Sequence, residues 1–461
     1  MSGSRLVTTD ERRARLGLRQ ALAVRAGSVE EAVESVVALH GTDPATVFLS
    51  AGARTGTPGP EPVEKALYED RTLVRMTGMR RTIFVVPREL APVIHHSSAL
   101  AIAVRERKRL TQHFMDGGGF DERWISRVEG EVLAALREHG ELTATRLGEV
   151  VPDLRTQIVY APGTAHEVKQ GVSTRLLFVM AAEGLIVRQG RPSGSWISGQ
   201  HRWAPAPEMP VLTAGEAQAE LVRRWLAAYG PGTEADLKWW TGWNLGEVRR
   251  ALRAVKAVTV ELEESAPGYV LPSDVEPAAP AEPWAALLPA LDPTPMGWQQ
   301  RDWYLPQAHR AELFDRSGNV GPTVWWNGAV VGGWGQRADG EVVWRLLEDV
   351  GADAVAAVER EAARLTAWLD GVTVTPASAP RWNVHSASDP QPRGGSRGGS
   401  RGGWGRASPT AAARRPPPGG DDLRDDRHGG LHLQGAVGPR RAVAHPAGSP
   451  YRDDLGCPPH E

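Results

Sequence analysis

The stretch VSTRLLFVMAAEGLIVRQGRPSGSWISGQHRWAP, residues 172–205, carries the clearest structural pattern in the chain. Its first part has the apolar spacing of a helix as far as Glu183, and Gly184 is typical of the position just after a helix end. A strand over 185–189 and another over 195–203 are predicted next, joined by a turn rich in Gly, Pro and Ser. The stretch therefore predicts a helix followed by a β-hairpin.

Two more helices are predicted directly before this stretch. EVLAALREHG (131–140) is amphipathic and ends at Gly140, and ELTATRLGEVV (141–151) contains a second helix that starts after a threonine. Three helices followed by a hairpin are the order of a winged helix-turn-helix, whose third helix reads the major groove of DNA. We therefore predict a winged-helix domain over 111–208.

The same order recurs on both sides of this domain. Toward the C-terminus, three predicted helices and a strand pair occupy 219–230, 233–242, 245–255 and 258–271. Toward the N-terminus, predicted helices over 12–24, 29–41, 44–55 and 61–70 precede a strand pair over 72–86. The sequence thus predicts three tandem winged-helix domains, at 1–110, 111–208 and 209–280.

A β-rich domain is predicted over 281–375. The stretch PTVWWNGAVVGGWGQRADGEVVWRLL (322–347) has Asn-Gly and Asp-Gly pairs between alternating apolar strands, which are strong hairpin signals. A helix over 354–369 and a strand over 372–375 are expected to close the domain. The predicted fold class is mainly α with β wings (α+β).

The composition changes sharply near Pro376. Residues 376–461 contain RGGSRGGSRGGWGR and ARRPPPGG, have no lysine, and show almost no aliphatic periodicity. Such a composition cannot bury enough apolar surface to form a core, so a disordered tail is predicted. Two alternatives remain open: an RNA-binding arm formed by the Arg-Gly-Gly repeats, and out-of-frame translation of a GC-rich gene.

Charge, cysteine content and hydropathy limit the possible functions. Outside the tail the chain has 41 basic and 47 acidic residues, so a non-specific DNA coat is excluded and any DNA surface must be a local basic patch. The one cysteine, Cys457, excludes a disulfide framework and a cysteine-ligated zinc site. Apolar runs are too short for a membrane span and no export signal is visible. We expect a cytoplasmic monomer without metal or cofactor.

Three stretches resemble one bacterial family, the winged-helix alkylpurine and interstrand-crosslink DNA glycosylases (AlkZ-like). They are VVALHGTDPATVFLSAGAR (36–54), TLVRMTGMRRTIFVVP (72–87), and LLPALDPTPMGWQQRDWYLP with FDRSGNVGPTVWWNGAVVGGWGQR (287–337). The resemblance implies duplex DNA as partner and removal of alkylated or crosslinked purines as activity. The family carries a Gln-x-Gln or Gln-x-Asp signature where this chain has His40-Gly41-Thr42.

His40, Thr42 and Asp43 are the candidate catalytic residues. An N3- or N7-alkylated purine is already a cationic leaving group, so its release mainly needs a placed water and stabilisation of an oxocarbenium-like sugar. A neutral His40 and the Thr42 hydroxyl are expected to position water, and Asp43 to stabilise the sugar cation. The alternatives are structural: His40 as the last residue of a helix, and Thr42 or Asp43 as the N-cap before Pro44.

Arginines are the candidate DNA contacts. Those beside the first strand turn suit phosphate contacts, and those on the second domain's recognition helix and wing form the stronger patch; together they are Arg75, Arg80, Arg81, Arg175, Arg188, Arg191 and Arg202. A repair glycosylase is the favoured function. The alternative is a non-catalytic duplex-DNA-binding or regulatory protein.

Overall fold

The computed structural model describes residues 4–56, 59–160, 163–164, 167–190, 195–263, 265–337 and 339–375. The predicted tail over 376–461 and the candidate Arg191 lie outside the described residues. Among those described, no helix combines the length and apolar character that crossing a bilayer requires.

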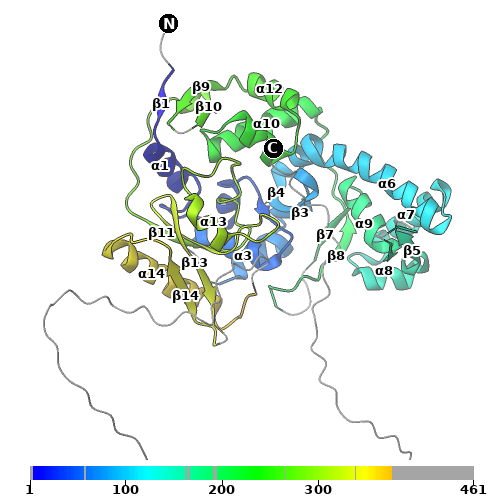
Figure 1. Ribbon diagram of the computed structural model, residues 1–461. Helices are drawn as coiled ribbons and strands as arrows, with labels where there is room; N and C mark the ends of the chain where they lie inside the picture. The colour runs from blue at the N-terminus through cyan, green and yellow to red at the C-terminus, as the bar shows by residue number, and fades with distance from the viewer. Residues whose placement is uncertain are drawn as a thin grey trace, which may run out of the picture. The chain divides into compact units, whose positions relative to one another are not determined.

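The segment that contains residues 172–205 has the predicted order of elements (Figure 1). It contains α7 (Glu122–His139), α8 (Ala144–Val150), α9 (Val172–Ala182), β7 (Ile186–Gln189) and β8 (Arg202–Pro205). Gly184 has a φ of +77°, which glycine adopts without a steric penalty, so the chain turns there from α9 into β7. The second wing strand is shorter than predicted, because residues 195–201 form turns and irregular chain.

A second hairpin in this segment was not predicted. β5 (Gln157–Tyr160) and β6 (Val168–Gly171) pair antiparallel between α8 and α9. The strands have only four residues each and β6 reads VKQG, so no apolar alternation marks it in the sequence.

The N-terminal segment confirms most of its predicted helices and the strand pair. Its α-helices and β-strands are β1 (Leu6–Val7), α1 (Thr9–Arg19), α2 (Val29–Glu34), β2 (Leu39–His40), α3 (Pro44–Arg54), α4 (Glu61–Glu64), β3 (Leu73–Thr77), β4 (Ile83–Pro87), α5 (Ala91–Ile94) and α6 (Leu100–Gly118). α6 runs through the boundary predicted near residue 110.

The helix predicted over 29–41 is wrong in its second half. α2 ends at Glu34, Val37 adopts a φ of +65°, and Leu39 and His40 pair with β4 as a strand. All four residues of the run Val36–Leu39 are at most 2% exposed. Burial on every side is typical of a strand inside a packed layer, whereas a surface helix would leave one face exposed.

The third segment has the predicted helices and wing. They are α10 (Ala214–Tyr229), α11 (Glu234–Thr241), α12 (Leu245–Ala254), β9 (Val258–Leu262) and β10 (Ser265–Val270). Each helix starts with a reciprocal capping box, formed by Thr213 with Glu216, by Thr233 with Asp236, and by Asn244 with Glu247. These pairs satisfy N–H groups that the first helical turn leaves without partners, which fixes where each helix begins.

The C-terminal segment is a meander covered by a helix. Its elements are β11 (Ala285–Leu288), α13 (Gln307–Leu313), β12 (Thr323–Trp326), β13 (Ala329–Gln336), β14 (Val342–Leu346) and α14 (Ala352–Leu369), and α14 packs on β11 and β14 (Figure 1). The strand predicted over 372–375 is wrong. Instead, the Gln336 side chain donates to the Val372 carbonyl at 3.0 Å and accepts from the Val374 N–H at 2.9 Å.

Within the described residues, the strands form sheets of five, four, three and two members. The five-stranded sheet has the order β2-β4-β3-β7-β8, so the wing of the second segment extends the strand pair of the first. One hydrophobic core combines residues of the first, third and C-terminal segments with Trp196 of the second, while most of the second segment packs around a core of its own. The candidate site lies at the five-stranded sheet.

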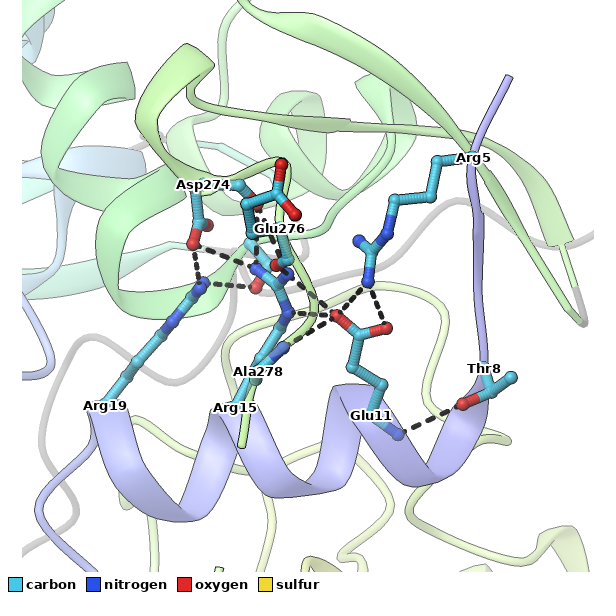
Figure 2. A network of polar contacts seen from close by, with 9 residues as sticks. Arg5, Thr8, Glu11, Arg15, Arg19, Asp274, Glu276 and Ala278 are labelled. Carbon is cyan, nitrogen blue, oxygen red and sulfur yellow. Dashed lines mark hydrogen bonds and ion pairs between the residues drawn. The ribbon is translucent and has the colours of Figure 1, made fainter. Parts of the chain in front are cut away.

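Charged side chains tie α1 to the stretch that follows β10 (Figure 2). The Glu11 carboxylate accepts from Arg5 at 2.6 and 2.7 Å and from Arg15 at 2.9 Å. Arg15, only 2% exposed, also donates to the Glu276 carbonyl at 2.7 Å, and Arg19 pairs with Asp274. A buried guanidinium needs several acceptors, and here α1 and the 274–276 backbone supply them.

Candidate functional site

His40 lies on the edge strand of the five-stranded sheet. It pairs with Phe84 of β4, and the two ring centroids are 5.1 Å apart. The side chain is 8% exposed, and its buried Nδ1 has no hydrogen-bond partner. The prediction that His40 ends a helix is therefore wrong, because its backbone belongs to a strand.

The surroundings of His40 keep the imidazole neutral. Burial, followed by the charge of Arg80, lowers its pKa to about 3, although Asp292 acts in the opposite direction. A neutral imidazole has one nitrogen that donates and one that accepts. His40 can therefore accept a hydrogen bond but does not carry a positive charge at neutral pH.

Asp43 caps α3, while Thr42 is exposed beside it. The backbone N–H and the hydroxyl of Thr46 donate to the Asp43 carboxylate at 3.1 and 2.8 Å, and Pro44 occupies the first helical position. The cap predicted from the Asp-Pro pair is thus present. Both contacts involve the same oxygen, Oδ2, of the half-buried side chain.

The charge of Arg75 acts on Asp43. Burial raises the pKa of the Asp43 carboxyl, and the Thr46 hydrogen bonds and the Arg75 charge oppose this rise. Burial likewise lowers the pKa of Arg75, and Tyr68 and Asp43 oppose that change. The candidate carboxylate and a candidate DNA-binding arginine therefore belong to one electrostatic environment, although they come from different predicted elements.

Arg75 and Arg188 meet across the sheet. They are partners in the pairing of β3 with β7, although they are more than a hundred positions apart in the chain. The Arg188 guanidinium lies 5.0 Å from the Trp203 ring centroid. Both arginines line a cavity of about 200 Å³ together with His201, whereas Arg202, on β8, is exposed.

Arg80 and Arg81 form the tight turn between β3 and β4, with φ values of +54° and +63°. The Arg80 guanidinium lies 4.5 Å from the Trp239 ring centroid, and Arg81 forms an ion pair with the buried Glu106 at 3.0 Å. Both side chains thus make contacts within the protein. Their predicted DNA contacts stay a prediction.

Arg175 lies in the first turns of α9. Its Nε donates to the Gln170 side chain at 2.8 Å, and its guanidinium lies 5.3 Å from the Tyr160 ring centroid. The unpredicted β5–β6 hairpin supplies both neighbours. The structure therefore places Arg175 against this hairpin, and Arg175 is not among the residues that line the cavity beside Arg75.

Comparison with known proteins identifies the family. The family model described as DNA glycosylase AlkZ-like matches residues 33–368, which is most of the chain. The chain belongs to the AlkZ-like DNA glycosylase family. Among solved structures, the Streptomyces sahachiroi DNA glycosylase AlkZ matches with a TM-score of 0.61 and 21% identity, over 80% of this chain and 98% of that one. At this identity the match shows a shared fold. No curated protein matches the sequence.

The AlkZ-like chain also places residues at the site that sequence reasoning missed. Tyr68, Arg71, Arg88 and His201 line the same cavity as Arg75 and Arg188. His201 falls within the stretch 172–205, but only the pairing of β3 with β7 brings it near Arg75, and that pairing has no signal in the sequence. Asp292, which acts on His40, comes from the family-like stretch 287–306, where its acidic side chain was the available signal.

In the described part of this AlkZ-like chain, no three His, Cys, Asp or Glu side chains are grouped as they would be to hold a metal ion.

Proposed function

We propose that the chain is a DNA glycosylase that hydrolyses the N-glycosidic bond of alkylated or crosslinked purines in duplex DNA. The observation that carries the proposal is the position of Asp43. In a chain of the AlkZ-like family, this carboxylate is half-buried and interacts electrostatically with Arg75. Arg75 lies on the five-stranded sheet, where it pairs with Arg188. Arginines on such a surface suit the phosphate backbone, and a nearby anion suits a sugar cation.

The reaction needs little from the protein beyond placement and charge. As the C1′–N bond breaks, its electron pair neutralises the alkylated purine, and the sugar gains oxocarbenium character. A water oxygen then bonds to C1′ and its proton passes to solvent or to a carboxylate, which leaves an abasic sugar and the free base. In our proposal, Asp43 stabilises the developing cation, and Thr42, exposed beside it, orients the water.

His40 is buried, whereas Thr42 is exposed, so the two residues contribute differently to this scheme. Its ring lies against Phe84 and its pKa is about 3, so it acts as a neutral acceptor. The buried Nδ1 without a partner is costly, and a hydrogen bond made when DNA closes over the site would remove that cost. We therefore propose that His40 helps to hold the water once substrate is bound.

Two observations favour a second function, a non-catalytic duplex-DNA-binding or regulatory protein. The Asp43 carboxylate already serves α3 as its cap, and His40 is buried. A site with only these structural roles would bind DNA without releasing a base.

Asp43→Asn separates the two functions, because asparagine caps helices about as well as aspartate but carries no charge. We expect release of N7-methylguanine from duplex DNA to slow by at least about 100-fold, since electrostatic stabilisation of a transition state is commonly of that size. Duplex affinity should stay within about twofold of wild type. The matched control is Asp121→Asn, which alters the cap of α7, where Asp121 accepts from the Trp124 N–H at 2.9 Å.

Asp121→Asn should release base at the wild-type rate, and His40→Ala should be slowed with its affinity retained. Equal rates for Asp43→Asn and wild type would remove Asp43 from the mechanism. Loss of activity in Asp121→Asn as well would assign the effect to helix capping.

A further inference from the structure

A cavity of about 200 Å³ opens beside the junction of β3 and β7. The polar residues of its lining come from the region before β3, from β3 itself, from the segment after β4, and from the wing: Tyr68, Arg71, Arg75, Arg88, Arg188, Gln189 and His201. Leu67, Val74 and Val187 contribute apolar surface to the same cavity. Cationic and apolar residues therefore both line the cavity.

Positive charge dominates this cavity. Arg75 and Arg188 stand directly opposite each other in the β3–β7 pairing, and like charges in that arrangement destabilise a sheet. Two carboxylates offset part of the charge, Glu141 at 2.8 Å from Arg71 and Asp43 through its interaction with Arg75. Among the contacts of the described residues, four arginines face these two carboxylates, which gives the lining an excess of positive charge.

His201 is sensitive to this excess. Burial, followed by the charges of Arg188 and Arg75, lowers its pKa to about 4, although a hydrogen bond with the Gly199 backbone opposes the change. The imidazole is therefore neutral at pH 7, and an anion would not find a fifth positive charge there. Arginine forks are the groups left to grip an anion, and their geometry suits two oxygens of one phosphate.

The size of the cavity suits more than an inorganic ion. Its volume of about 200 Å³ is well above the roughly 30 Å³ that one water molecule occupies in the liquid. A phosphate against the arginines would leave room beside Leu67, Val74 and Val187 for the apolar face of an attached sugar.

We propose that this cavity is a docking site for one backbone phosphate of duplex DNA and its deoxyribose. Arg75 and Arg188 bind the phosphate oxygens, and Arg71 and Arg88, which line the same cavity, add positive charge. The assignment rests on the proposed function for the identity of the DNA, and it gives Arg75 a positioning role. Because the charge of Arg75 also acts on Asp43, a DNA strand held in this cavity lies near the candidate carboxylate.

The test measures binding of undamaged duplex DNA, so it does not depend on base release. Arg188→Gln should raise the Kd about tenfold at 0.1 M salt and reduce the slope of log Kd against log salt by about one, as loss of one phosphate contact does. Arg188→Lys keeps the charge but not the forked guanidinium, so its Kd should lie between those of the wild type and Arg188→Gln. The control is Arg360→Gln, an exposed position on α14 with the same change in charge, which should bind like wild type.

A second arm locates the phosphate. Duplexes with one neutral methylphosphonate, moved along the strand, should weaken wild-type binding at one position in particular, and that position should have no further effect in Arg188→Gln. Equal losses in both proteins at every position would overturn the proposal. So would saturation of the cavity by inorganic phosphate, followed through the His201 ring signals in NMR spectra, if it left duplex affinity unchanged at constant ionic strength. That result would assign the cavity to a free anion.

Discussion

The side chain of His40 shows how strongly a fold can alter one residue. In the sequence it ends an apolar run before a glycine, which is equally compatible with a helix end and a strand. In the structure the ring lies against Phe84 on a buried strand, and this burial decides its ionisation. The Asp43 cap, by contrast, could be predicted, because the Asp-Pro pair at a helix start is a local signal.

The low pKa of His40 makes stability depend on pH. The unfolded chain takes up a proton near pH 6.5, whereas the folded state does so only near pH 3. Stability is therefore unaffected above about pH 6.5 and falls as the pH drops through that value toward 3, by up to about 1.4 kcal/mol per pH unit. We expect His40→Asn to reduce the loss between pH 7.5 and 5.5 by about 1 kcal/mol, measured by urea unfolding. An unchanged pH dependence would contradict the burial of a neutral His40.

A second prediction concerns the buried ion pair of Arg54 and Asp292. Both side chains are fully buried, their closest N–O distance is 2.7 Å, and Thr294 and the Ser50 carbonyl complete the network. Asp292→Ala leaves a buried charge without its partner, so we expect a loss of about 3–5 kcal/mol in the free energy of unfolding.

The control for this pair is Asp302→Ala, which breaks the exposed pair with Arg310 and should cost less than about 1 kcal/mol. Similar losses in the two variants would mean that Arg54 and Asp292 do not form the buried link between α3 and the C-terminal segment.

At the scale of elements, turns and caps were the most predictable features. The hairpin between β12 and β13 follows from its Asn-Gly pair, since Asn327 and Gly328 have φ values of +46° and +82°. The prediction of a helix over 29–41 is wrong beyond Glu34, because the continuous apolar run that follows is compatible with both helix and strand. The β5–β6 hairpin has no such local signal, and its strands are defined only by their pairing.

Gly328→Ala tests the β12–β13 turn. The backbone at Gly328 has a left-handed conformation, with a φ of +82°. An added Cβ would lie 2.9 Å from the Arg13 Cα of α1. Gly340 has a φ of +92°, but its added Cβ would meet only the end of the Gln336 side chain at 3.9 Å. We expect Gly340→Ala to cost about 1–2 kcal/mol from strain, and Gly328→Ala distinctly more, in thermal unfolding. Equal costs would show that α1 does not approach the turn.

At the scale of the whole molecule, the sequence could supply the order of elements but not their partners. The five-stranded sheet joins β3 of the first predicted domain to β7 of the second, and the main core draws on all four predicted segments, on the second through Trp196. Pairing between strands so far apart leaves no periodic pattern in either of them. The cavity beside Arg75, and the meeting of Arg75 with Arg188, could therefore not be derived from the sequence.

The central claim is that this AlkZ-like chain removes an alkylated purine by hydrolysis. The most direct measurement incubates the wild-type protein with duplex DNA that contains N7-methylguanine, and separately with a nitrogen-mustard crosslink, and identifies the products by chromatography and mass spectrometry. We expect free alkylated base and an abasic site on at least one substrate, well above the rate of spontaneous depurination. Release equal to a no-protein control on both substrates, by a protein that still binds the duplex, would contradict the account.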